Sequence, residues 1–224
     1  VYYSTNGNAY IAKQATTGNA PTNATYWSQF AQGSGGIWSG GLSLGTANQV
    51  VAVNSGATAL EFQDAASGGI AQVVQGTKTD TTSITGNSNQ VFQDSGVSAS
   101  ITPSSTSNKI LIMANLIVGS QGGQRTAGKL VSVIGGSTAD IFRADAAGSR
   151  ARGHTIMNLS NGYNSQTFQM HYLYSPNTTS AVTIKAQLWV EGSSTMYVNR
   201  NDTDTDSSTW SRGASQITLM EVTV

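Results

Sequence analysis

The sequence predicts an all-β fold in which residues 70–224 form a β-sandwich or jelly roll. Short apolar or alternating runs recur at regular spacing in this region, and polar turn residues separate them. No segment repeats its apolar residues with the 3.6-residue period of a helix. The chain contains 25 glycines and no cysteine, which suits tight turns and excludes disulfides and thiolate chemistry. Evenly spaced short strands of this kind are typical of sandwiches and jelly rolls.

The charge content excludes several classes of partner. Charged residues make up 10% of the 224 residues and the net charge is zero, whereas ordinary soluble domains have roughly 25%. No basic run is present, so we expect no nucleic-acid partner. No stretch approaches the ~20 apolar residues of a membrane span, so we expect no membrane insertion. Uncharged polar residues dominate instead, which favours a structural or binding protein that works outside a cell.

Residues 1–33 predict a small aromatic β module. Asn6-Gly7-Asn8 separates two short apolar runs, which indicates a hairpin with an Asn-Gly turn. The succession of a Tyr, Gly7-Asn8-Ala9-Tyr10, Pro21 and Trp27 resembles small chitin- and cellulose-binding-like modules of secreted glycosidases and phage tail fibres. The resemblance implies carbohydrate binding, with Tyr10 and Trp27 as candidate contacts. The opening segment of such modules is absent, so we expect an N-terminally incomplete module.

Residues 34–69 predict a glycine-rich linker followed by a collar hairpin. Glycine is too dense between residues 33 and 45 for a helix. Val50–Val53 and Leu60–Phe62 predict two strands joined by a turn at Asn54-Ser55-Gly56. Because a lone hairpin is marginal in water, we expect it to pack on other copies of itself. The sequence segment from Leu44 to Phe62 resembles a short repeat of phage tail-fibre shafts and collars.

The strands of the sandwich follow from apolar runs and alternation. Lys109–Val118 is the longest apolar run and predicts a strand buried on both faces. Residues 181–190 alternate so that every second side chain is apolar, and we expect Met196–Asn199 to pair with this strand. Further predicted strands are 70–74, 79–85 (or a loop), 90–92, 97–101, 130–134, 139–143, 155–159, 167–174 and 217–224.

The closing strand carries apolar side chains on both faces, with Ile217 and Leu219 on one and Met220 and Val222 on the other. This pattern indicates either a central strand or a contact around a symmetry axis. The sequence segments 98–112 and 215–222 resemble the C-terminal heads of marine-phage tail fibres. Those heads look like trimeric jelly rolls of the tumour-necrosis-factor and complement-C1q type. The resemblance implies that residues 70–224 form a homotrimeric, receptor-binding head.

No catalytic constellation is recognisable. The sequence has no Gly-x-Ser-x-Gly elbow, complete phosphate-binding loop or recognisable glycosidase carboxylate pair, so we expect no enzyme activity and no cofactor. Asp202-Thr-Asp-Thr-Asp206 has the spacing of a calcium loop, but Ser207 and Gly213 replace its glycine and glutamate, which favours a solvated turn. We expect His171 to face solvent or to form a hydrogen bond within the sheet. Threefold repetition of this histidine around a trimer axis would also permit a metal site.

The remaining candidate function is binding through loops. Sugars present apolar ring faces and many hydroxyls, so their sites combine exposed aromatic rings with amide and hydroxyl groups. The candidate receptor- or glycan-binding residues of the head are Tyr163, Asn164, Tyr197, Arg200, Trp210 and Arg212. Strand-edge packing of the tyrosines and core capping by the tryptophan are the alternatives. Three further loop arginines fit either acidic sugars or contacts between subunits: Arg125, Arg150 and Arg152.

The sequence therefore predicts the distal part of a phage tail fibre, an extracellular part of the virion. Its homotrimeric head would attach to a host cell-surface glycan or outer-membrane protein, and the chain would contact other tail or fibre proteins. Two alternatives remain open. One is a purely structural virion fibre or decoration protein, and the other is the accessory binding region of a secreted glycan-degrading enzyme.

Overall fold

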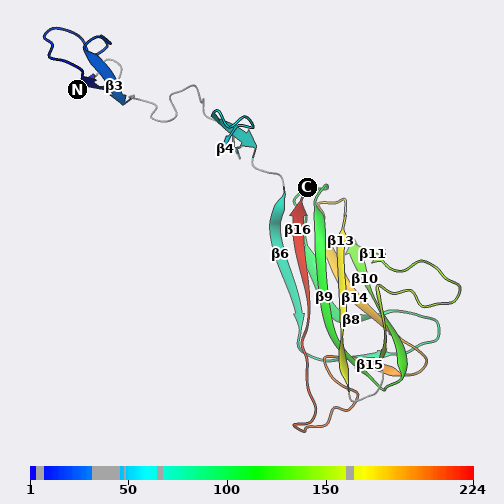
Figure 1. Ribbon diagram of the computed structural model, residues 1–224. Coiled ribbons are helices and arrows are strands. Elements are labelled where there is room, and N and C mark those ends of the chain that lie inside the picture. Colours follow the sequence, from blue (N-terminus) through cyan, green and yellow to red (C-terminus); the bar gives the residue numbers. More distant parts are fainter. Residues whose placement is uncertain (4–7, 32–45, 48, 65–67, 160–163) are drawn as a thin grey trace. The chain divides into compact units, whose positions relative to one another are not determined.

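The computed structural model describes residues 1–3, 8–31, 46–47, 49–64, 68–159 and 164–224 (Figure 1). All regular secondary structure in these ranges is β-strand, which confirms the all-β prediction. No helix in this part of the chain could span a membrane. The chain divides into two compact units, residues 1–67 and 68–224.

A three-stranded antiparallel sheet occupies the first unit, in the order β1 (Tyr2–Tyr3), β2 (Asn8–Ala12) and β3 (Trp27–Ala31). The predicted Asn-Gly turn lies outside the described residues. Tyr10 is buried and meets the ring of Tyr3 edge to face, with 6.5 Å between centroids. The Trp27 indole donates to the carbonyl of Asn19 at 3.1 Å. Trp27 therefore holds the small sheet to its long loop, and Tyr3 packs against Tyr10 within the sheet.

The predicted hairpin is also present, formed by β4 (Gln49–Val53) and β5 (Leu60–Asp64). Asn54 organises its turn, because its Oδ1 accepts hydrogen bonds from the amides of Thr58 and Ala59 at 2.9 and 3.3 Å. Ala57 adopts a φ of 54°, the left-handed conformation that such a turn needs. The hairpin strands bury no side chain fully.

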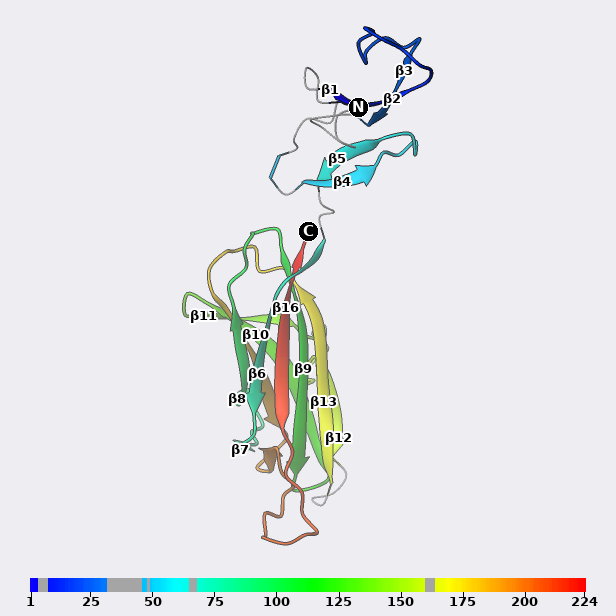
Figure 2. The same ribbon diagram turned by 90° about the vertical axis from the view of Figure 1, so that its left-hand side faces the viewer.

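The second unit is a sandwich of two antiparallel sheets (Figure 2). One sheet has the order β11-β10-β14-β8, with β12 also pairing with β10. The other has the order β6-β16-β9-β15-β7, with β13 also pairing with β9. The strands are β6 (Gly69–Lys78), β7 (Thr82–Thr85), β8 (Gln93–Ile101), β9 (Lys109–Ser120), β10 (Gln124–Ile134), β11 (Ser137–Phe142), β12 (Thr155–Leu159), β13 (Ser165–Tyr174), β14 (Val182–Val190), β15 (Thr195–Val198) and β16 (Ser215–Thr223).

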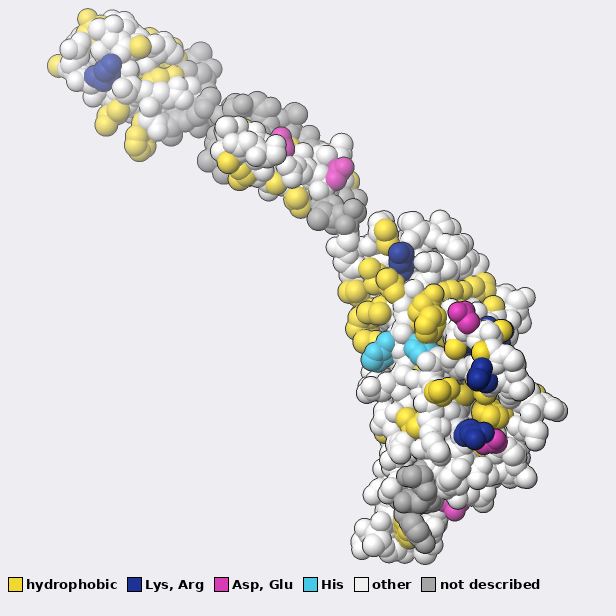
Figure 3. All heavy atoms as spheres, turned by 45° about the vertical axis from the view of Figure 1, so that its right-hand side comes forward, with side chains coloured by type: hydrophobic (Ala, Val, Ile, Leu, Met, Phe, Trp, Pro, Cys, Tyr) yellow, Lys and Arg dark blue, Asp and Glu magenta, His cyan; other side chains and the backbone are white. Residues whose placement is uncertain are grey.

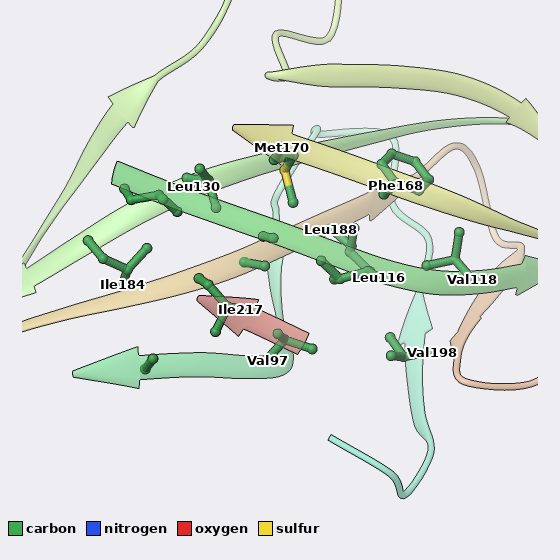
Figure 4. Close-up of a cluster of buried hydrophobic side chains, with 14 of the residues drawn as sticks. Val97, Leu116, Val118, Leu130, Phe168, Met170, Ile184, Leu188, Val198 and Ile217 are labelled. Atoms are coloured by element: carbon green, nitrogen blue, oxygen red, sulfur yellow. The ribbon is translucent and has the colours of Figure 1, made fainter. Parts of the chain in front are cut away.

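Alternation along the strands builds the core between the two sheets (Figure 4). The predicted inward residues of β14 are all fully buried: Val182, Ile184, Ala186, Leu188 and Val190. Phe168 and Met170 of β13 face them from the other sheet and are also fully buried. The predicted burial of both faces of β9 is wrong, since Ile110 and Ile112 are buried but Leu111 and Met113 are only half-buried. One face of β9 lines the core, and the other lies on the outside of the sheet.

Two further strand predictions are wrong. Residues 195–198 pair with β7 and β9 rather than with β14, because the chain crosses to the opposite sheet after β14. Residues 90–92 form a loop, and Gln90 has a φ of 57° that no strand accommodates. The closing strand β16 lies between β6 and β9 and is therefore central within its sheet. Its outward Met220 and Val222 are only half-buried, so the position of the strand does not by itself account for its second apolar face.

Candidate functional site

The loop that joins β15 to β16, residues 199–214, gathers several of the predicted binding residues. It projects from the end of the sandwich opposite the start of β6 and the end of β16 (Figure 2). Arg200, Trp210 and Arg212 lie in this loop, and Tyr197 lies on the strand that enters it. We refer to residues 199–214 as the distal loop.

Asn199 anchors both ends of the distal loop. Its side chain is fully buried and its φ of 64° turns the chain out of β15. The Nδ2 group donates to the carbonyls of Lys78 and Asp80 at 2.8 and 2.9 Å. Its Oδ1 accepts from the hydroxyl of Ser215 at 2.6 Å, and that hydroxyl accepts from the amide of Ile117 at 2.9 Å. Buried amides are stable only when bonded in this way, so the network fixes the loop on the sheet.

The stem of the distal loop packs directly on β9. A Cβ on Gly119 would lie 2.5 Å from the carbonyl oxygen of Arg200 and 2.9 Å from the Cα of Asn201. Only glycine permits this approach of two backbones. Arg200 and Arg212 form an antiparallel bridge, and the amide of Gly213 donates to the carbonyl of Asn199 at 3.0 Å. The loop therefore leaves the sandwich on a closed, hydrogen-bonded stem.

Asp204 lies between the two arginines of the stem. Its carboxylate is 2.6 Å from Nη2 of Arg212 and 3.8 Å from Nε of Arg200. The Arg200 guanidinium also donates to the carbonyls of Asn201 and Asp202 at 2.8 and 2.7 Å. It stacks 3.6 Å from the ring centroid of Tyr197. Arg200 and one face of Tyr197 are thus engaged within the loop, while Arg212 is the more exposed guanidinium (58% against 14%).

The outer part of the distal loop encloses a pocket of about 330 Å³. Its lining combines one aromatic ring with hydroxyls, carboxylates and a guanidinium: Thr203, Asp204, Thr205, Asp206, Ser207, Trp210, Ser211 and Arg212. Such a lining offers an apolar surface for a sugar ring and several donors and acceptors for its hydroxyls. Two carboxylates face one arginine, so the pocket carries an excess of negative charge.

The Asp202-Thr-Asp-Thr-Asp206 run does not form a cage. Among the described residues, no three His, Asp or Glu side chains lie close enough together to hold a metal ion. Asp204 is instead the ion-pair partner of two arginines, a role that the sequence analysis missed. The clue in the sequence was the presence of Arg200 and Arg212 on either side of the acidic run.

The remaining predicted site residues lie elsewhere. Tyr163 lies outside the described residues. Asn164 is exposed next to β13, whose Ser165 pairs with Gly119, so Asn164 lies at the same end of the sandwich as the distal loop. Tyr10 and Trp27 belong to the first unit, where Tyr10 is buried and Trp27 is half-buried.

No protein-family model matches this chain, and no curated protein matches it. Similar solved structures come from infectious bursal disease virus. They include the Gx strain (TM-score 0.36, 10% identity, 78% of this chain and 44% of that chain). They also include the Gt strain (0.38, 10%, 92% and 48%) and the VP2 subviral particle (0.37, 12%, 78% and 43%). This chain spans less than half of each of these proteins. At such TM-scores and identities the similarity supports no conclusion about family or activity.

Proposed function

We propose that residues 68–224 are the receptor-binding head of a phage tail fibre and that three copies associate through the outer face of the six-stranded sheet. One observation carries the proposal. An apolar row crosses four neighbouring strands of that face, because Val73 pairs with Met220, Met220 with Leu111, and Leu111 with Leu173. Side chains of directly paired residues lie side by side on one face, so the four form a continuous strip.

This strip is open to solvent in the single chain. Val73 is 56% exposed and Leu173 is 45% exposed, while Leu111 and Met220 between them are half-buried. Exposed Ile70 and half-buried Val222 extend the apolar surface toward the end of β16. Soluble monomers rarely expose contiguous apolar surface of this kind, and such surface marks sites of association.

A second copy of the chain is the partner that this face suits best. The next two rows of the face are polar apart from Met113 and, apart from the histidine, carry no titratable group: Gln75, Thr218, Met113 and His171, then Thr77, Gln216, Asn115 and Gln169. Amide side chains both donate and accept hydrogen bonds, so these two rows can meet their counterparts without like-charge repulsion. A cation, Lys109, lies on the other side of the apolar strip, where it pairs with Val222. Figure 3 shows hydrophobic side chains gathered beside the histidines on this unit. The resemblance to trimeric fibre heads favours three copies.

The distal loop is the receptor-binding element in this proposal. Rotational symmetry would point the three loops of a trimer in one direction, away from the end at which β6 begins. Each pocket is small, so a single contact would be weak. Three linked sites raise effective affinity by about 10²–10⁴-fold, which suits attachment of a virion to a host-surface glycan or protein. The proposed role of the pocket is binding without catalysis, and the proposed place of action is the extracellular virion.

Light scattering over a dilution series tests the assembly. We expect the full chain to have the mass of a trimer and the double variant Val73→Gln, Leu173→Gln to dissociate, because polar side chains interrupt the apolar strip. The matched control is Val91→Gln, which changes an exposed valine in a loop and should leave the mass unchanged. A wild-type chain that stays monomeric at all concentrations contradicts the proposed head.

Binding is tested separately on variants that remain trimeric. Trp210→Ala removes the one aromatic ring among the described residues that line the pocket, and we expect at least about a tenfold loss of adsorption to host cells. Unchanged adsorption by an intact trimer would favour a purely structural role for the fibre. A folded monomer that binds polysaccharide would favour the accessory region of a secreted enzyme.

A further inference from the structure

A second concavity lies on the other sheet of the sandwich and has no part in the proposed function. It is a groove of about 680 Å³, within the size range of ligand sites. Ala127 of β10 and Trp189 of β14 are cross-strand partners in its floor. Ile156 of β12 forms one wall, and residues 149–151 with Gln90 form the other side. The groove is separate from the distal loop and from the apolar strip.

The groove is held open by hydrogen bonds that join distant segments. Gln90 donates from Nε2 to the carbonyl of Ser149 at 2.6 Å and so ties together two loops that lie 59 positions apart. The Trp189 indole donates to the carbonyl of Asn87 at 2.8 Å, which fixes the ring in the floor. Thr126 donates to the carbonyl of Met157 at 3.0 Å between β10 and β12. A preformed groove binds ligand without the cost of ordering its walls.

The described residues that line the groove carry a net positive charge. Its lining contains Arg125, Arg150 and Glu191 as charged residues, whereas the whole chain has a net charge of zero. Arg125 pairs with Glu191 at 3.2 Å, but its side chain is 77% exposed. Arg150 donates to the carbonyl of Ala147 at 3.4 Å, the long end of the hydrogen-bond range. Among the described residues no carboxylate pairs with Arg150, so its guanidinium has donors to offer an anion.

Apolar surface lies beside these cations. The Ile156 side chain is 74% exposed although it lines the groove, whereas Met157 beside it in the strand packs against the core. Amide groups of Gln90 and Asn158 also line the groove. A ligand that satisfies all of these groups needs a carboxylate for the arginines, an apolar ring face for the isoleucine, and hydroxyls for the amides. An acidic saccharide has all three features.

We propose that this groove binds a carboxylate-bearing saccharide, with Arg150 and Arg125 on its carboxylate and Ile156 against the sugar ring. A planar guanidinium matches a carboxylate with two parallel hydrogen bonds, which gives specificity over neutral sugars. The groove lies on the five-stranded sheet, so it stays accessible when copies associate through the six-stranded sheet. The proposal therefore holds for a monomer as well as for a trimer.

Calorimetric titration of the full chain tests this site with a tetrasaccharide of hexuronic acid and a neutral hexose tetrasaccharide. We expect only the acidic sugar to bind and Arg150→Gln to weaken its binding roughly tenfold or more, since a hydrogen bond to a charged group is lost. Arg143→Gln is the matched control, because Arg143 lies in the same segment but pairs with Asp140 at 2.8 Å and does not line the groove. The acidic sugar should also bind more weakly as salt is raised.

Three results would overturn the assignment. The first is equal binding of the neutral and acidic sugars. The second is no effect of Arg150→Gln on a variant whose circular dichroism matches the wild type. The third is a tetraglutamate peptide that binds as tightly as the tetrauronate, which would assign the groove to an acidic protein segment.

Discussion

Glu221 shows at the level of single residues how this weakly charged chain uses a carboxylate. The side chain is fully buried on β16. Its two oxygens accept hydrogen bonds from the Ser104 amide and hydroxyl, from Asn108 Nδ2 and from Gln72 Nε2, at 2.6–2.7 Å. Burial alone would raise the pKa of Glu221, but the bonds from Asn108, Gln72 and Ser104 outweigh it and lower the pKa to about 2. The carboxylate thereby fastens the loop before β9 to the closing strand.

This depressed pKa predicts a loss of stability in acid. Between about pH 4.5, the ordinary glutamate value, and about pH 2, the unfolded chain binds a proton that the folded chain does not. The contribution of Glu221 is therefore complete above pH 4.5 and is lost as the pH falls to 2. Glu221→Gln should lower the free energy of unfolding at pH 7 by about 2–3 kcal/mol, because its amide would face hydrogen-bond donors. Urea unfolding at several pH values measures both effects.

Glu191→Gln serves as the control for this prediction. Glu191 forms an exposed ion pair with Arg125, and such pairs contribute little to stability. Its variant should unfold within about 0.5 kcal/mol of the wild type and keep the steep acid dependence. Equal acid dependence of the Glu221→Gln variant and the wild type would disprove the role of Glu221.

The distal loop marks the limit of residue-level prediction from the sequence. Tyr197, Arg200, Trp210 and Arg212 could be named because aromatic and amide-rich loops are typical of binding sites. The arginines on either side of the acidic run indicate an ion pair, but the choice of Asp204 depends on the left-handed backbone of Asn199 and on the pairing of the two arginines. Local spacing of acidic residues resembles a metal loop whether or not the backbone folds into one.

At the level of strands, alternation predicts which side chains face the core but not which strand is the neighbour. The inward residues of β14 followed directly from a period of two. The same pattern contained nothing to show that β15 crosses to the other sheet and pairs with β7 and β9. Pairing depends on where the connection runs, and in a sandwich a short connection can join either sheet.

Gly76 of β6 lies directly against the backbone of β8, and the sequence shows no sign of this contact. A Cβ at this position would clash with the carbonyl oxygen of Ser98 and lie 2.9 Å from its carbonyl carbon. Gly76→Ala must therefore push two backbones apart, and we expect a loss of about 1–3 kcal/mol in urea unfolding. Gly69→Ala on the same strand is the control, because its Cβ would meet nothing within 4 Å. If both variants unfold alike, the close approach does not limit stability.

At the level of the whole molecule, the second unit has a core of its own. All buried members of the main hydrophobic cluster lie between Ile84 and Leu219, within residues 68–224. The strip that we propose for association also lies entirely in this unit. A region that contains both its core and its contact surface meets the requirements of an independent domain.

We therefore expect residues 68–224, expressed alone, to fold and to associate as the full chain does. The 6%-exposed Trp189 reports the packing of the five-stranded sheet, so residues 68–224 should retain the near-ultraviolet circular dichroism signal of a tryptophan in a fixed environment. The urea midpoint should also match, because no residue of the main core is removed. Light scattering then separates the two sources of assembly. A trimer from residues 68–224 means that the apolar strip is sufficient, whereas a folded monomer beside a trimeric full chain would assign association to residues 1–67 and contradict the strip.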